Sequence, residues 1–178
     1  MNMKGNAPSV ANTLSVAIAN FLFSLCGKYS VSENTKIDFL SENADLIQRA
    51  ISVARTTGTK NNKTCRQTPV VSAIFCALYC GVDDDALREF CYAANTGFST
   101  SEYQTSAIVL RRYMEETCSW GNWINKKTAF VEANCAIKDF ANKRPRRKAY
   151  PADSDCVYFN KVKDELLSPY IDSYDGIA

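Results

Sequence analysis

The chain contains no histidine, and this absence limits the chemistry available to it. Histidine is the usual general base near neutral pH, a common metal ligand and a member of the Ser-His and Cys-His nucleophile systems. The short motifs of several enzyme classes are missing too, since no GxGxxG, GxxxxGK, HExxH or GxSxG sequence occurs. No pair of carboxylates stands out for hydrolysis. We therefore predict that the protein is not an enzyme and uses no cofactor.

Neither sign of charge is in excess, and no long apolar segment is present. The 21 basic and 19 acidic residues leave a net charge of only +2, so the chain as a whole has no field that would indicate a nucleic-acid or membrane partner. The apolar stretch at residues 14–26 is interrupted by Ser15, Asn20 and Ser24, and it is too short and too polar to span a bilayer. It also lacks the small-residue cleavage site of a signal peptide. We expect a cytoplasmic protein without a membrane partner.

Cysteine, by contrast, is abundant, with eight residues in the chain. No CxxC pair occurs, so the zinc-ribbon and thioredoxin patterns are absent. Cys76 and Cys80 share a helix face at the i, i+4 spacing, but a zinc site would need two further ligands, and core packing explains the pair more simply. Asp83, Asp84 and Asp85 are consecutive, so on a helix they point in different directions and make a poor chelate. We predict reduced thiols and no metal site.

Residues 64–97 contain the start and stop signals of two consecutive helices. Thr68 is a suitable N-cap for the first, Pro69 suits its first helical position, and Gly81 is placed to end it. Asp83 is placed to cap the second helix, which Gly97 ends. Apolar residues fill the first helix and form one stripe along the second. We therefore predict a tight helical hairpin at the centre of the fold.

Helical periodicity continues on both sides of this hairpin, and no repeat of fixed period occurs. Ser99 and Glu102 have the spacing of a capping box, which predicts that a helix begins at Ser99. The fold class that we predict is all-α, a single compact bundle of six to seven helices around the central hairpin. A helical domain would occupy residues 1–150, with its core at about 9–142, and a C-terminal extension with a short helix and a polar tail would occupy 151–178. The other expected helices cover residues 10–26, 36–54, 99–118, 126–142 and part of 152–167.

A basic loop precedes the central hairpin. Residues 56–68 are polar and include Gly58, and they carry Lys60, Lys63 and Arg66 with no acidic residue among them. Two interpretations are open. The loop is either a solvated connector or an anion-binding loop that leads to a helix N-terminus, where free amides favour a phosphate.

The strongest charge cluster lies at residues 143–151 (KRPRRKAYP), which we call the basic strap. Its five cations fall within six residues: Lys143, Arg144, Arg146, Arg147 and Lys148. The strap is either a solvated tail or a contact for nucleic-acid backbone or an acidic protein face, and Tyr150 adds a group able to stack on a base. Lys126 and Lys127 begin the preceding helix, the unfavourable end for cations, which suggests that they serve a partner.

The order of several short motifs resembles a known helical region. These motifs are DFLSEN at 38–43, RQTPV at 66–70, a GVD segment with a later L-x-x-F at 81–90, NTGF at 95–98, A-x-x-L-R-R-Y at 107–113 and A-I-x-x-F at 136–140. This order is similar to the helical region that follows the ParB/sulfiredoxin-like domain in many phage and mobile-element proteins. The ParB-like domain is absent here, so its activity is not carried over. The resemblance implies a phage or plasmid protein that works near nucleic acid or a nucleoprotein machine.

We therefore predict a non-catalytic helical binding module of phage or mobile-element type, in the cytoplasm of the host cell. Its partner would be nucleic acid or a host nucleoprotein complex. The alternative is a phage inhibitor of a bacterial defence complex that acts by protein–protein contact, which suits a small chain without catalytic groups. The predicted contact residues are Lys60, Lys63, Arg66, Lys126, Lys127, Lys143, Arg144, Arg146, Arg147, Lys148 and Tyr150.

Overall fold

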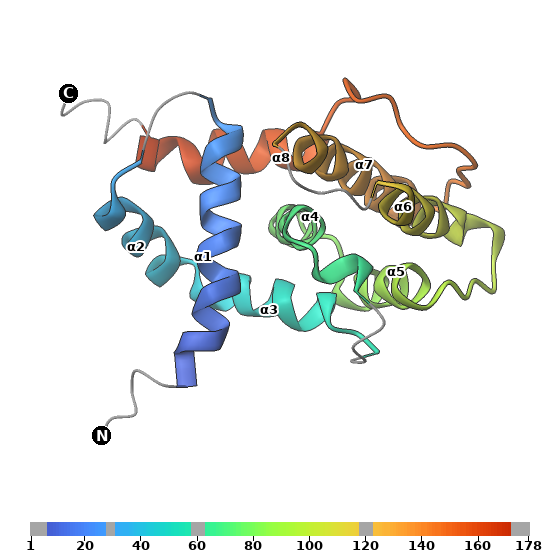
Figure 1. The fold of residues 1–178 in the computed structure, drawn as a ribbon, viewed down its shortest axis with the longest axis horizontal. Helices are drawn as coiled ribbons and strands as arrows, with labels where there is room; N and C mark the ends of the chain where they lie inside the picture. The colour runs from blue at the N-terminus through green and yellow to red at the C-terminus, as the bar shows by residue number, and fades with distance from the viewer. Residues whose placement is uncertain (1–6, 28–30, 58–62, 118–122, 172–178) are drawn as a thin grey trace.

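The described part of the chain is helical throughout its regular structure (Figure 1). The computed structural model describes residues 7–27, 31–57, 63–117 and 123–171, with side chains left out for 7–12 and 123–124. Within these ranges there are eight α-helices and no strand, which confirms the all-α prediction. The helices are α1 (Ala7–Leu25), α2 (Glu33–Glu42), α3 (Ala44–Ala54), α4 (Thr68–Tyr79), α5 (Asp84–Thr96), α6 (Thr105–Glu116), α7 (Trp123–Ala141) and α8 (Val157–Val162). Shorter segments are the 3-10 turns η1 (Thr64–Arg66) and η2 (Glu102–Gln104) and the π-helical turn η3 (Lys163–Leu167).

Helix α4 lies at the centre of the core. Every residue from Pro69 to Leu78 is buried, and the helix packs against α1, α3, α7 and α8. Its sequence is apolar on all sides, and such a helix is stable in water only when neighbours cover every face. The apolar run that the sequence placed at the centre of the fold is therefore the element around which the other helices pack.

The hairpin of α4 and α5 forms as predicted, except at its first residue. Gly81 adopts φ +92° and donates its N–H to the Leu78 carbonyl at 3.0 Å, which ends α4. The Asp83 side chain accepts from two backbone N–H groups in the first turn of α5, and Gly97 ends α5 with φ +84°. Thr68, however, is the first residue of α4 and not its N-cap.

The single helix predicted for residues 36–54 is broken at Asn43, which separates α2 from α3. Asn43 leaves helical geometry, with φ −118° and ψ 21°, and its side-chain amide donates to the Phe39 carbonyl at 2.9 Å. The break reorients α2, so that Phe39 is fully buried. Ile37, an apolar residue of the same helix, is 59% exposed. This extra break accounts for eight helices where six to seven were predicted.

The predicted capping box of Ser99 and Glu102 does not form. The Ser99 hydroxyl donates to the Ser101 carbonyl, and the Gln104 side chain accepts the Thr100 N–H at 2.8 Å. Glu102 is instead the first residue of the 3-10 turn η2, and α6 begins after this turn. The connection between α5 and α6 is therefore longer than predicted, and it contributes to the candidate site.

The C-terminal segment is part of the same core as the rest of the molecule. Helix α8 packs against α4, η3 continues directly from α8, and the two segments bury Phe159, Val162 and Leu167. The Phe159 ring meets that of Phe130 on α7 edge to face, with centroids 5.4 Å apart. The core thus extends beyond the predicted span of 9–142. Helices α1 and α7 also begin three residues earlier than predicted.

Candidate nucleic-acid interface

The basic strap begins with a tight turn at the end of α7. Lys143 adopts φ +57°, and its N–H bonds to the Phe140 carbonyl at 3.0 Å. The Arg144 N–H bonds to the Asp139 carbonyl at 2.8 Å, which completes a Schellman-type cap. Glycine is the usual residue at such a left-handed position, so Lys143 adopts it at some cost. The turn sends the chain back over α6 and α7.

Hydrogen bonds then hold the strap against both helices. The Arg146 N–H donates to the Thr105 hydroxyl at the start of α6, over 2.9 Å. The Tyr150 N–H donates to Oε1 of Glu132 on α7 over 2.7 Å, and the Tyr150 hydroxyl donates to the Asp139 carboxylate. These anchors come from two different helices. The strap is therefore a fixed part of the surface, in contrast to the solvated tail that the sequence left open.

Tyr150 is an anchor of the strap and not an exposed stacking surface. The Arg146 guanidinium lies 4.0 Å from the centre of its ring and also donates to the carbonyls of Lys148 and Ala149. Burial, together with the hydrogen bond to Asp139, raises the pKa of Tyr150 well above its usual value of about 10. Both the ring and the hydroxyl are thus committed to contacts within the molecule.

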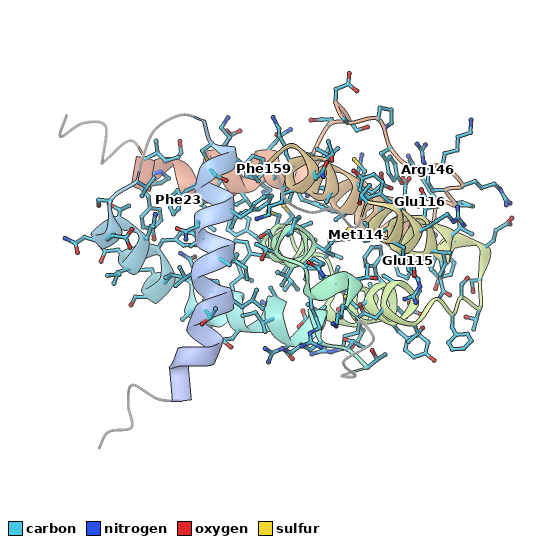
Figure 2. All side chains as sticks on the ribbon, viewed as in Figure 1. Phe23, Met114, Glu115, Glu116, Arg146 and Phe159 are labelled. Carbon is cyan, nitrogen blue, oxygen red and sulfur yellow. The ribbon has the colours of Figure 1, made fainter. Side chains whose placement is uncertain are left out.

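The strap closes one side of a pocket of about 570 Å³. The strap and the connection between α5 and α6 lie at the same end of the molecule, opposite α2 (Figure 1). Figure 2 shows Arg146 at this end, away from Phe23 and Phe159. We call this 570 Å³ pocket the strap pocket. Its lining residues are Gly97, Phe98, Ser99, Thr105, Ile108, Val109, Arg112, Arg146 and Arg147.

Three arginines from two separate segments meet at the strap pocket. Arg112 is exposed on α6 and has no ion pair with any described residue. Arg147 pairs with Glu102 at 2.6 Å, but both side chains are mostly exposed. Such surface pairs contribute about 0–1 kcal/mol, so an incoming phosphate can replace Glu102 at small cost. Arg146 is already bonded to the strap and forms a fixed cationic wall.

The described predicted cations outside the strap do not line the strap pocket. Lys126 and Lys127 are exposed in the second turn of α7, and Lys126 lines a different pocket of about 310 Å³ together with Thr68 and residues of α1. At a rise of 1.5 Å per residue, Lys126 lies about 22 Å along the helix from the end of α7, where the strap begins. Lys63 precedes η1 and Arg66 ends it; both are exposed and close in sequence to Thr68. Lys60 lies outside the described residues. The predicted contact residues therefore fall into two groups.

Sequence reasoning missed Phe98, Arg112 and Glu132. Phe98 is an aromatic residue that follows the helix-ending Gly97 and precedes a run of polar residues, and this pattern can be read from the sequence. Arg112 lies in the helix predicted for residues 99–118, and only the path of the strap shows that it lines a pocket. Glu132 lies within an apolar helix, and its burial follows from the strap that covers it.

The comparisons with known proteins give no identification. No protein-family model, no curated protein and no solved structure matches this chain. The resemblance to the helical region of ParB-associated phage proteins therefore stays a hypothesis.

The described residues contain neither a membrane-spanning helix nor a metal-ion cluster. No helix in the described ranges has the length and apolar character required to cross a bilayer. Among the described side chains, no cluster of three or more histidine, cysteine, aspartate or glutamate residues has a geometry suited to a metal ion. All seven described cysteines are free thiols; the eighth, Cys118, lies outside the described residues.

Proposed function

We propose that this protein is a non-catalytic nucleic-acid-binding module, of phage or mobile-element type, that binds the phosphate backbone at the strap pocket. The observation that carries the proposal is the convergence of Arg112, Arg146 and Arg147 on one concave site. Guanidinium groups bind phosphate oxygens in a bidentate manner, and the phosphate backbone supplies most of the affinity of proteins for nucleic acid. The fixed strap holds the backbone of Arg146 and Arg147 in place, so this segment does not need to become ordered when a ligand binds.

An acidic pocket elsewhere on the molecule supports the strap pocket as the site where a polyanion binds. A pocket of about 440 Å³ near α2 and η3 is lined by Asp38, Glu42 and Glu165. This acidic region and the basic strap lie at opposite ends of the molecule (Figure 1). A polyanion would therefore be repelled near this acidic pocket and attracted to the arginines of the strap pocket.

The proposal is tested by removing two pocket charges and comparing the salt dependence of binding. The variant Arg112→Gln/Arg147→Gln is matched by Arg55→Gln/Arg88→Gln, which removes two exposed charges outside the strap pocket. Binding of a labelled oligonucleotide is measured by fluorescence anisotropy over a range of salt concentrations. Each lost phosphate contact lowers the slope of log K against log salt by about 0.7–0.9, so the pocket variant should lose about 1.5.

Two outcomes would contradict the proposal. If both double variants weaken binding equally, the effect reflects net charge and not the strap pocket. If the wild type binds no oligonucleotide at low salt, nucleic acid is not the partner. Capture of a host protein complex that survives nuclease treatment would then favour the alternative, an inhibitor of a bacterial defence complex acting through protein contact.

A further inference from the structure

Phe98 is the most exposed of the large apolar side chains in the described part of the chain, at 67%. Local backbone geometry and hydrogen bonds fix the position of its main chain. Gly97 turns the backbone with φ +84°, and the Phe98 N–H donates to the Thr96 hydroxyl at 3.1 Å, which itself donates to the Tyr92 carbonyl. A single exposed apolar residue is ordinary on a protein surface. Phe98 differs because it lines the strap pocket, whose lining also includes Ile108 and the three arginines.

This combination favours a ligand that has both a flat apolar part and an anionic part. Phe98 and Ile108 provide the apolar surface, and the arginines provide the charge. A nucleotide has both features, since a base stacks on an aromatic ring while its phosphate binds a guanidinium group. In a duplex the base faces are covered by neighbouring bases, whereas a single strand can present an unstacked base to a pocket.

We infer that the strap pocket receives an unstacked base of a single-stranded nucleic acid, with Phe98 stacking on the base and Arg112 and Arg147 binding the adjacent phosphates. This inference rests on the proposed function and specifies its substrate. The volume of about 570 Å³ lies within the range of small-ligand sites and suits one nucleotide unit rather than the convex surface of a duplex. A phosphate-bearing partner without a base would leave Phe98 unused.

The experiment compares four probes of about 12 nucleotides, a length within the usual site sizes for single-strand binding. They are single-stranded DNA, single-stranded RNA, a DNA duplex, and a single strand with abasic sugars in place of nucleosides. Each is titrated with the wild type and with Phe98→Ala, Phe98→Tyr and Tyr92→Ala. Tyr92 is the matched control, because it is an aromatic residue on α5 that is 48% exposed and does not line the strap pocket. Phe98 is largely exposed, so its substitution should leave folding intact.

Phe98→Ala should weaken the binding of single strands by about 5- to 150-fold, the range measured for loss of one stacking contact. It should leave the duplex and the abasic strand unchanged, and Phe98→Tyr should retain wild-type affinity. If Phe98→Ala has no effect, or weakens the single strand and the duplex equally, the inference is wrong and the proposed function still stands. If the wild type binds none of the probes, both fall. If it binds the abasic strand as tightly as the single strand, the pocket binds phosphate alone and the inference falls.

Discussion

At the scale of single residues, the most unusual group is Glu132, a carboxylic acid buried beneath the basic strap. It is 1% exposed, and one oxygen accepts the Tyr150 N–H at 2.7 Å. The other oxygen has no hydrogen-bond partner among the described residues. Burial raises the pKa of Glu132 to about 7, although the Tyr150 N–H and the charge of Arg146 both act to lower it. Glu132 is therefore mostly neutral in the folded protein below pH 7.

This raised pKa makes the stability of the strap region depend on pH. The unfolded chain has a glutamate pKa near 4.3, so between that value and about 7 the folded state binds more protons. The stabilising contribution of protonated Glu132 is fully present below about pH 4.3 and is lost as the pH rises through 7, by on the order of 3–4 kcal/mol in total. Glu132→Gln keeps the acceptor for the Tyr150 N–H but cannot ionise. We expect this variant to be more stable than the wild type at pH 8 and equal to it near pH 4.5.

Urea unfolding of both proteins across this pH range provides the measurement. Groups other than Glu132 also make stability depend on pH; the pKa of Asp84, for example, is lowered mainly by its hydrogen bond with Arg49, and its contribution is lost at acidic pH. The informative quantity is therefore the difference in unfolding free energy between variant and wild type. If the two curves stay parallel from pH 4.5 to 8, Glu132 does not titrate in the folded protein as described.

At the scale of elements, one side chain connects the ends of three helical segments. Asn95, in the last turn of α5, is fully buried. Its amide donates to the carbonyls of Ala54 and Thr56 at the end of α3, at 3.2 and 3.1 Å, and its oxygen accepts the N–H of Cys65 in η1 at 2.9 Å. From α6, Arg111 donates to the Asn95 carbonyl. This junction fixes the end of α5, from which the connection that carries Phe98 departs.

Asn95→Ala should therefore be strongly destabilising. It removes three buried hydrogen bonds and leaves their backbone partners without replacements, which predicts a loss of about 2–4 kcal/mol in the free energy of unfolding. Asn142→Ala is a suitable control, because Asn142 is exposed and its amide donates only to the Lys138 carbonyl one turn earlier. Chemical denaturation of both variants gives the comparison. Equal small losses in the two would show that the Asn95 junction carries little of the stability.

The elements also show which structural features can be predicted from this sequence. The boundaries marked by Gly81, Asp83 and Gly97 were predicted correctly because each depends on a bond within a few residues. The break at Asn43 was missed, since Asn43 also meets the Tyr170 hydroxyl from a segment 127 residues away. The strap cations are adjacent in sequence and were predicted as a group. The strap pocket was not predicted, because it requires α6 to lie beside the strap.

At the scale of the whole molecule, the C-terminal segment completes the core around α4. Phe159, Val162 and Leu167 belong to the same buried cluster as the residues of α1, α3 and α7. The Cys80 thiol of α4 contacts the Tyr158 carbonyl, and the Tyr79 hydroxyl donates to Glu165 at 3.0 Å. Without α8 and η3, one face of an entirely apolar helix would be exposed to water. The segment should therefore unfold together with the rest of the protein.

Leu167→Ala tests this cooperativity, with Val157→Ala as its control. Leu167 is fully buried in η3, so its truncation should cost about 2–5 kcal/mol, whereas Val157 is 41% exposed on the same segment and should cost less than about 1 kcal/mol. Because α8, η3 and α4 share one core, Leu167→Ala should lower the protection of the α4 amides from hydrogen exchange by the same free energy as it lowers global stability. A C-terminal extension that unfolds independently would lose protection only in α8 and η3, while the amides of α4 kept their wild-type exchange rates.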